Sequence, residues 1–255
     1  MSMTTQPMVI LGGFMSFARL YDDMREALEA LTGCRVLVVQ THSHDWLPSV
    51  STWGWAYLLR KVERAVQQAV RESESGKVTL IGHSAGGVLA RLYLGPRPFW
   101  GQASRGLAHV DTLVTLGSPH ANQGGLTRGG RMSRWAERHY PGAYFDGVAY
   151  ASVAGKLTRG DAAGTPRERF AHKTYQQISG QGDAWGDGLI PIQSALLPGA
   201  RQIVLDGVGH FDGFGGPWYG SRQVIPLWWQ RAGGDHGCAS TSEADSRGDV
   251  VSRAR

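Results

Sequence analysis

The chain has 255 residues, of which 42% are hydrophobic and 18% charged, and a formal net charge of +5 at pH 7. This length and composition fit a globular protein with one large core or two small ones. The arginines and lysines form no dense run, so nucleic-acid binding is not indicated. No apolar stretch approaches the length of a membrane span, and we expect no integral membrane segment.

Cysteine usage adds a further constraint. Cys34 and Cys238 are the only cysteines; the first follows an expected helix and the second lies in a polar tail. We therefore expect neither a structural disulfide nor a cysteine metal site. The apolar segment from Met8 to Phe14 is too short for a signal sequence, so the default expectation is a reducing, cytoplasmic location.

Six short apolar runs predict the strands of a mostly parallel sheet. The first are continuous rather than alternating, as in strands that are buried on both faces. The six runs cover residues 8–11, 36–39, 78–81, 111–116, 174–179 and 202–206. Helical periodicity lies between them over residues 17–31, 55–74 and 85–93, and a last helix is expected after them, over residues 221–231. This alternation is typical of βαβ units in an α/β fold.

One connection is much longer than the others. Residues 121–173 separate the fourth and fifth expected strands, whereas strand-to-helix loops usually have a few residues. Ligands of open α/β sheets bind at the carboxyl ends of the strands, so this insertion is a candidate cap over the site. Its aromatic residues would equally fit a satellite core under a long loop. We expect one domain over residues 1–232, with this insertion, and a disordered tail over 233–255.

The segment around Ser84 carries the strongest functional signal. Gly82-His83-Ser84-Ala85-Gly86 lies between an expected strand and an expected helix, which is the setting of a nucleophile elbow. The serine of such a turn has strained backbone and an exposed hydroxyl. Residues two before and two after it must lack side chains, because the strand and the helix would otherwise collide.

Several motifs together resemble those of the α/β-hydrolases, in particular lipases and GPI inositol deacylase-like esterases. The motifs are Leu11-Gly12-Gly13-Phe14, the elbow, Leu116-Gly117-Ser118-Pro119-His120, Gly186-Asp187-Gly188-Leu189-Ile190-Pro191 and Gly207-Val208-Gly209-His210. The resemblance covers residues 8–231. It implies an α/β-hydrolase fold with a minimal six-stranded sheet flanked by helices, without the first two strands of the full fold, and an acid in the fourth motif.

The base and the acid also follow from chain order. A serine nucleophile needs an imidazole base that is oriented by a carboxylate, and in this fold the order is Ser, then Asp or Glu, then His. His210 is the only histidine that follows the late acids outside the polar tail. Asp187 and Asp183 both lie in the loop after the fifth expected strand. Asp187 fits the family motif better, and Asp183 is the alternative.

The oxyanion that forms during attack needs two donors. We expect the backbone N–H of Ala85 and that of Phe14, a role that Met15 could share. His120 is expected to pack rather than to react. No cofactor is expected, and His42 and His44 are not expected to bind a metal, because no third ligand was recognised nearby.

The sequence thus predicts a serine esterase or lipase-like hydrolase that forms an acyl-enzyme, with a hydrophobic ester or lipid as substrate. A thioesterase or an acyltransferase would use the same groups. The alternative from another class is a catalytically silent protein of this fold that binds a small apolar ligand or a partner protein. The oligomeric state does not follow from the sequence.

Overall fold

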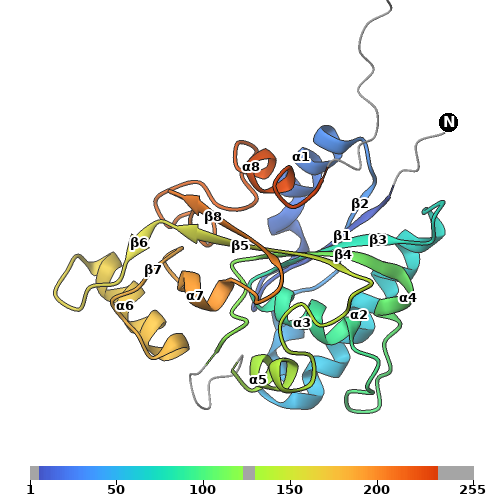
Figure 1. Cartoon of the computed structure of the whole chain (residues 1–255), viewed down its shortest axis with the longest axis horizontal. Coiled ribbons are helices and arrows are strands. Elements are labelled where there is room, and N and C mark those ends of the chain that lie inside the picture. The colour runs from blue at the N-terminus through green and yellow to red at the C-terminus, as the bar shows by residue number, and fades with distance from the viewer. Residues whose placement is uncertain (1–5, 123–129, 235–255) are drawn as a thin grey trace, which may run out of the picture.

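Six parallel strands form the central sheet in the computed structural model, which describes residues 6–122 and 130–234 (Figure 1). In chain order they are β1 (Met8–Leu11), β2 (Val36–Val38), β3 (Val78–His83), β4 (Val110–Leu116), β5 (Ala149–Lys156) and β8 (Arg201–Asp206). Their order across the sheet is β2-β1-β3-β4-β5-β8, and every neighbouring pair is parallel. The expected six-stranded, mostly parallel sheet is confirmed.

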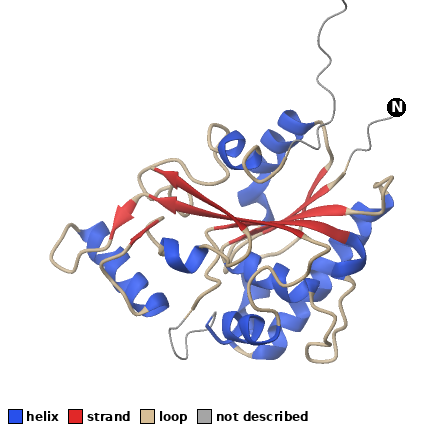
Figure 2. Cartoon of the chain, viewed as in Figure 1, coloured by secondary structure: helices blue, strands red, loops and turns tan. Residues whose placement is uncertain are grey.

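Helices cover both faces of this sheet (Figure 2). One face carries α1 (Asp22–Thr32) and α8 (Ile225–Trp229), and the other carries α2 (Thr52–Arg71), α3 (Ala85–Leu94) and α5 (Gly130–His139). The shorter elements are two 3-10 helices, η1 (Ala18–Tyr21) and η2 (Ser43–Val50), and two single-turn helices, α4 (Gly106–His109) and α7 (Ile192–Ala195).

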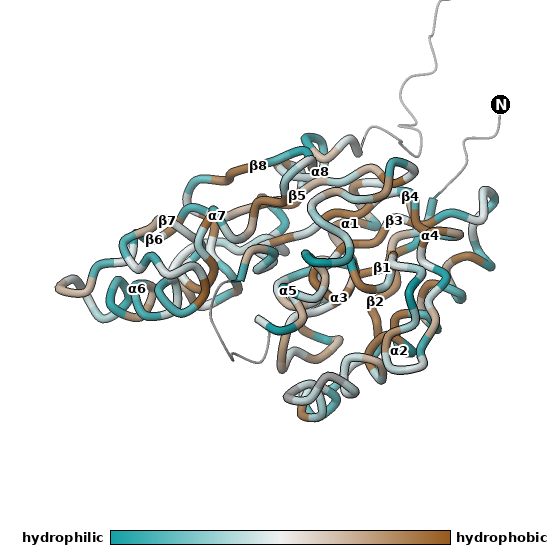
Figure 3. The backbone as a smooth tube through the Cα atoms, turned by 60° about the horizontal axis from the view of Figure 1, so that its bottom comes forward, coloured by the Kyte–Doolittle hydropathy of each residue, from teal (hydrophilic) through white to brown (hydrophobic). Residues whose placement is uncertain are grey.

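The sheet separates two hydrophobic cores. Successive residues of a strand point to opposite faces. Accordingly, Val9 and Leu11 of β1 pack with α2 and α3, whereas Met8 and Ile10 pack with α1 and α8. The central strands are therefore apolar on both faces. In Figure 3 they are the mostly brown, hydrophobic segments in the middle of the molecule. This layered packing fixes the strand ends from which the site residues emerge.

The fifth strand of the sheet is not where the sequence predicted it. Residues 174–179 belong to α6 (Pro166–Ser179), and the fifth strand is β5, which lies within the expected insertion. α6 has its own start signal, because the Thr165 and Glu168 side chains cap each other's backbone N–H and Pro166 occupies the first turn. β5 contains alanine, serine and glycine, which weaken its apolar pattern. The β-branched and aromatic residues of α6 were therefore mistaken for a strand.

The expectation of a single cap-like insertion over residues 121–173 is therefore wrong, because β5 lies within these residues. Between β4 and β5 the described chain holds α5, which packs against the α2–α3 core. A second excursion follows β5 and consists of β6 (Thr158–Arg159), α6 and β7 (Trp185–Gly186), with β6 and β7 paired antiparallel. In Figure 1 this excursion projects beyond β5 and β8.

Most of the expected tail, residues 235–255, lies outside the described residues. Within the described ranges, no helix combines the length and the apolar character that crossing a membrane requires.

Candidate active site

Ser84 lies at the sharp turn between β3 and α3. Its backbone has φ 55° and ψ −128°, a conformation that residues other than glycine rarely adopt. A Cβ at Gly82 would lie 2.5 Å from the Cα of Gly87, and one at Gly86 would lie 2.3 Å from the carbonyl oxygen of Leu11. Both glycines are therefore required by the close packing of strand, turn and helix, as the sequence predicted.

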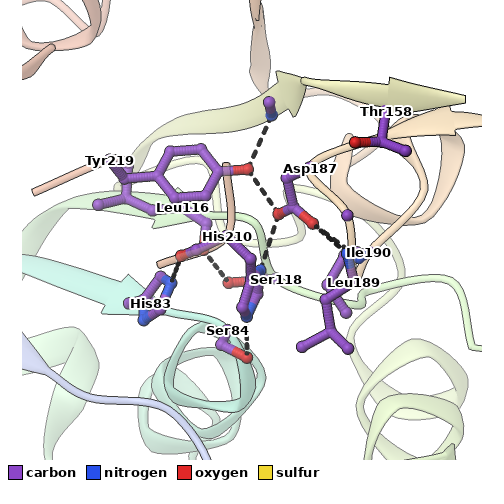
Figure 4. A network of polar contacts seen from close by, with 12 residues as sticks. His83, Ser84, Leu116, Ser118, Thr158, Asp187, Leu189, Ile190, His210 and Tyr219 are labelled. Carbon is purple, nitrogen blue, oxygen red and sulfur yellow. Dashed lines mark hydrogen bonds and ion pairs between the residues drawn. The ribbon is translucent and has the colours of Figure 1, made fainter. Parts of the chain in front are cut away.

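The loop after β8 brings His210 to this serine (Figure 4). The His210 Nε2 atom lies 3.0 Å from the Ser84 Oγ, and the Nδ1 atom lies 2.8 Å from the Asp187 Oδ2. The backbone N–H of His210 also donates to the Asp187 carbonyl at 2.9 Å. The histidine and the acid are thus fixed to each other through backbone and side chain together.

Asp187 is completely buried, and several donors surround its carboxylate. Oδ1 accepts from the backbone N–H groups of Ile190 at 2.7 Å and Leu189 at 3.0 Å, while Oδ2 faces His210. Burial alone raises the pKa of Asp187, but attraction to His210 and these hydrogen bonds outweigh burial and hold the pKa below its ordinary value. The group is therefore a carboxylate at neutral pH, which orients the imidazole with Nδ1–H toward it.

Two tyrosines that the sequence did not indicate form hydrogen bonds to the acid loop, which is the segment with Asp187 between β7 and α7. The Tyr219 hydroxyl donates to Asp187 Oδ2 at 2.8 Å and accepts from the Gly155 N–H at 2.7 Å. Burial, and then the Asp187 charge, raise the pKa of Tyr219 well above its ordinary value, so the hydroxyl stays a donor. The Tyr175 hydroxyl accepts from the Gly188 N–H at 2.8 Å. No local pattern marks these residues, because their partners are remote in the chain.

The alternative acid, Asp183, and a second carboxylate close to His210 in the sequence, Asp206, lie elsewhere. Asp183 is exposed on the loop before β7, where its backbone carbonyl accepts from the Arg159 side chain. Asp206 is exposed at the end of β8 and pairs with Lys156 at 3.2 Å. Of these carboxylates and that of Asp187, only the last has a hydrogen bond to His210.

The loop after β1 passes directly against the serine. A Cβ at Gly13 would lie 2.8 Å from the Ser84 Cβ, so only a glycine permits this approach. The next residue is Phe14, whose ring packs edge-on against Trp46 with 6.0 Å between centroids. Ala85 begins α3, where backbone N–H groups lack helical acceptors. Both expected oxyanion donors thus belong to segments that border Ser84.

A cavity of about 250 Å³ opens beside the Ser84 hydroxyl. Its apolar residues come from the loop after β1, α2, the start of α3, the loop after β4, α6 and the loop that carries Asp187, and its polar residues come from η2, the loop after β4 and α6. The apolar residues are Phe14, Trp55, Ala85, Pro119, Ile178, Leu189 and Ile190, and the polar ones are Ser49, Asn122, Thr174 and Gln177. The contribution of α6 was not predicted, because its residues were expected in a strand.

His120 has a structural environment, as expected. Its Nε2 lies 2.9 Å from the Thr115 Oγ1 and its Nδ1 lies 3.5 Å from the buried Arg91 guanidinium. Burial, and then the charge of Arg91, lower the pKa of His120 well below its ordinary value. A neutral ring is required here, because Nδ1 accepts from the guanidinium while Nε2–H donates.

His42 and His44 have a third potential metal ligand beside them, contrary to the expectation that no such ligand lies nearby. Ligand atoms of His42, His44 and Asp45 lie within 4.8 Å of one another. The Asp45 carboxylate is already engaged, since it accepts from Lys61 at 2.9 Å and from Tyr57 at 2.7 Å. Both histidines are exposed. The cluster forms the polar start of η2 and lies apart from the Ser84 cavity lining.

Comparison with known proteins supports the fold. The family model described as a PGAP1-like alpha/beta domain matches residues 55–128, a stretch that contains β3, Ser84 and β4. The chain also resembles MGS-MChE2, an alpha/beta hydrolase enzyme from the metagenome of lagoon sediments of Mar Chica, Morocco. That match has 17% identity and a TM-score of 0.50, and it covers 89% of this chain and 91% of the other. No curated protein matches the sequence.

Two further solved structures resemble the chain more weakly. Aspergillus fumigatus lipase B matches with 14% identity and a TM-score of 0.47, over 79% of this chain and 45% of the other. The product of the lin2722 gene of Listeria innocua matches with 14% identity and a TM-score of 0.47, over 88% and 93%. The six-stranded parallel sheet and the likeness to MGS-MChE2 show that the chain has an α/β-hydrolase fold.

Proposed function

We propose that the protein is a serine hydrolase that cleaves carboxylic esters through an acyl-enzyme. One observation carries this proposal: Ser84, His210 and Asp187 are joined by hydrogen bonds of 3.0 and 2.8 Å at the edge of a largely apolar cavity. A serine hydroxyl is a weak nucleophile until a base within hydrogen-bond reach removes its proton.

The proposed reaction has two halves. The Ser84 Oγ attacks the ester carbonyl while its proton passes to His210 Nε2, and the alcohol then leaves with that proton. Water attacks the acyl-enzyme with His210 as base, which releases the acid and restores Ser84. Asp187 stays ionised and stabilises the imidazolium that forms in each half, since its Oδ2 faces Nδ1–H.

The tetrahedral oxyanion is stabilised by the backbone N–H groups of Ala85 and Phe14 in this proposal. The start of α3 also places the positive end of the helix dipole near the developing charge. Removing one such donor in other serine hydrolases lowers kcat by roughly 100- to 1,000-fold. No cofactor takes part in any step of this proposal.

The cavity supports a hydrophobic acyl group as the bound part of the substrate. A cavity of roughly 150 Å³ holds a benzene molecule, with six carbon atoms. By the same packing, the 250 Å³ beside Ser84 would hold about ten carbons. We therefore propose esters with a hydrophobic acyl group as the preferred substrates, with about ten acyl carbons held within this cavity.

The test is labelling with a fluorophosphonate probe followed by peptide mapping. Wild type should be labelled at Ser84, Ser84→Ala should not be labelled, and His210→Ala should react far more slowly. Ser194→Ala is a matched control, because the buried Ser194 hydroxyl meets no hydrogen-bond partner among the described residues. Folded wild type that neither reacts with the probe nor hydrolyses a butyrate ester would refute the hydrolase and favour a ligand-binding protein.

The choice of acyl acceptor is a separate proposal. Water as acceptor gives an esterase, whereas an acyltransferase would use the same groups with an alcohol, and a thioesterase would release a thiol. Ester and thioester substrates with the same acyl chain, assayed side by side with and without an added alcohol, distinguish these three activities.

The cytoplasmic location stays a prediction from cysteine usage, and fractionation of the native host tests it.

A further inference from the structure

His83, the residue before the proposed nucleophile, makes two buried hydrogen bonds that the proposed reaction does not use. Its Nδ1 lies 2.8 Å from the Tyr21 hydroxyl, and its Nε2 lies 2.9 Å from the backbone carbonyl of His210. The Tyr21 hydroxyl is in turn 2.9 Å from the backbone N–H of Gly13. His83 and Tyr21 are both nearly inaccessible to solvent.

Only one arrangement of protons satisfies all of these groups. The His210 carbonyl can only accept, so Nε2 of His83 carries the proton and its Nδ1 is an acceptor. The Tyr21 hydroxyl therefore donates to Nδ1 and uses its oxygen to accept from the Gly13 N–H. The result is a chain of hydrogen bonds that runs in one direction from Gly13 through Tyr21 and His83 to His210.

The electrostatics of His83 are consistent with this assignment. Burial, and then the nearby His210, lower the pKa of His83 to about 3, so the ring is neutral at physiological pH. An imidazolium would donate from both nitrogens and could not accept from Tyr21. The neutral ring is the form that can hold both neighbours at once.

This chain of hydrogen bonds ends in two loops, and the proposed reaction requires both loops to be placed correctly around Ser84. Gly13 precedes Phe14, a proposed oxyanion donor, and lies against Ser84. His210 is the proposed base, and the acceptor is its own backbone carbonyl. The two loops follow β1 and β8, which lie on different sides of β3 and β4 in the sheet. His83 stands at the end of β3, between them.

We propose that Tyr21 and His83 are positioning residues. They hold the loop after β1, which carries the proposed oxyanion donor, and the loop after β8, which carries the proposed base, in fixed positions around Ser84. This inference rests on the proposed function. Neither residue touches the reacting atoms. Their effect is on the placement of the Phe14 N–H and the His210 ring, and a misplacement of about 1 Å in such groups costs up to roughly 100-fold in rate.

Packing alone is the competing explanation. The His83 ring also contacts aromatic rings, with centroids 5.8 Å from Tyr21 and 5.5 Å from Trp218. Tyr21→Phe separates the two explanations, because it keeps the ring and removes only the hydroxyl. Tyr93→Phe is the matched control, since Tyr93 is equally buried but belongs to the core on the other face of the sheet.

The first measurement is steady-state kinetics on a butyrate or octanoate ester. We expect Tyr21→Phe to lower kcat by at least about 10-fold with KM within about twofold, because an interaction realised in the transition state is weakened. A trifluoromethyl ketone, which forms the tetrahedral adduct, should bind less tightly by a similar factor. His83→Gln keeps a donor toward the His210 carbonyl and should be more active than His83→Leu, which keeps none.

The second measurement needs no turnover. Amide hydrogen exchange at Gly13 should be slow in wild type and at least about tenfold faster in Tyr21→Phe, while Tyr93→Phe leaves it unchanged. If wild type hydrolyses no ester, the proposed function fails and the exchange data alone decide this inference. Unchanged Gly13 exchange in Tyr21→Phe, or a kcat within twofold of wild type in an active enzyme, would overturn it.

Discussion

Replacing Asp187 by asparagine tests the proposed base and acid through a single atom. The orientation of the new amide is dictated by the backbone, because the N–H groups of Leu189 and Ile190 both donate to Oδ1. Only the amide oxygen can occupy that position. The NH2 group must therefore replace Oδ2, which lies 2.8 Å from His210 Nδ1. The Tyr219 hydroxyl, which donates to Oδ2 in the wild type, would then have to accept from this NH2 group.

The consequence is a change of tautomer. An NH2 donor opposite Nδ1 requires that nitrogen to be an acceptor, so the His210 proton moves to Nε2 and points at Ser84. The imidazole can then no longer take the serine proton. The equivalent substitution in a serine protease lowers kcat by roughly 10,000-fold while the fold persists. We expect a loss of about 1,000- to 10,000-fold here, or about 4 to 5.5 kcal/mol in the activation free energy.

The assay is the pre-steady-state and steady-state hydrolysis of a p-nitrophenyl ester at neutral pH, with circular dichroism as a check on folding. Asp183→Asn is the matched control, because Asp183 is exposed on the loop before β7, close to Asp187 in the sequence, and was the alternative acid. It should retain full activity. A folded Asp187→Asn protein within tenfold of wild type, or an Asp183→Asn protein with a comparable loss, would refute the assignment of the acid.

Two further outcomes follow from the site and its buried histidines. The pKa of His83 is about 3 in the fold, against about 6.5 when unfolded, so unfolding takes up a proton between these values. This group should therefore lower the free energy of unfolding by about 1.4 kcal/mol per pH unit below pH 6. Urea unfolding at pH 7.5, 6 and 5 should show the loss. If the free energy of unfolding of His83→Gln falls with pH as steeply as that of the wild type, the prediction is contradicted. Ile178→Trp should fill part of the cavity and lower kcat/KM for decanoate far more than for acetate esters, whereas an equal loss for both would exclude α6 from the acyl site.

The sequence by itself determined the features that depend on neighbouring residues. The elbow could be predicted because a strand, a strained serine and a helix in direct succession require Gly82 and Gly86, and a side chain at either position would collide with neighbouring backbone. The first four strands of the sheet were likewise predictable, because strands buried on both faces are continuous apolar runs. The last strand was predictable from its short apolar run, although only alternate residues of β8 are buried. Chain order selected His210 and left Asp187 and Asp183 as candidate acids, between which the family motif favoured Asp187. The fold brings Asp187 and His210 into hydrogen-bond contact.

Only the tertiary structure decided what depends on partners distant in the chain. The fifth strand was misassigned because β5 owes its place to burial between β4 and β8, whereas its small residues carry little strand signal. The roles of Tyr21, Tyr219 and α6 were missing for the same reason. A tyrosine hydroxyl becomes a support of the site only when folding places a backbone amide or a carboxylate within about 3 Å of it, and no local pattern encodes that distance.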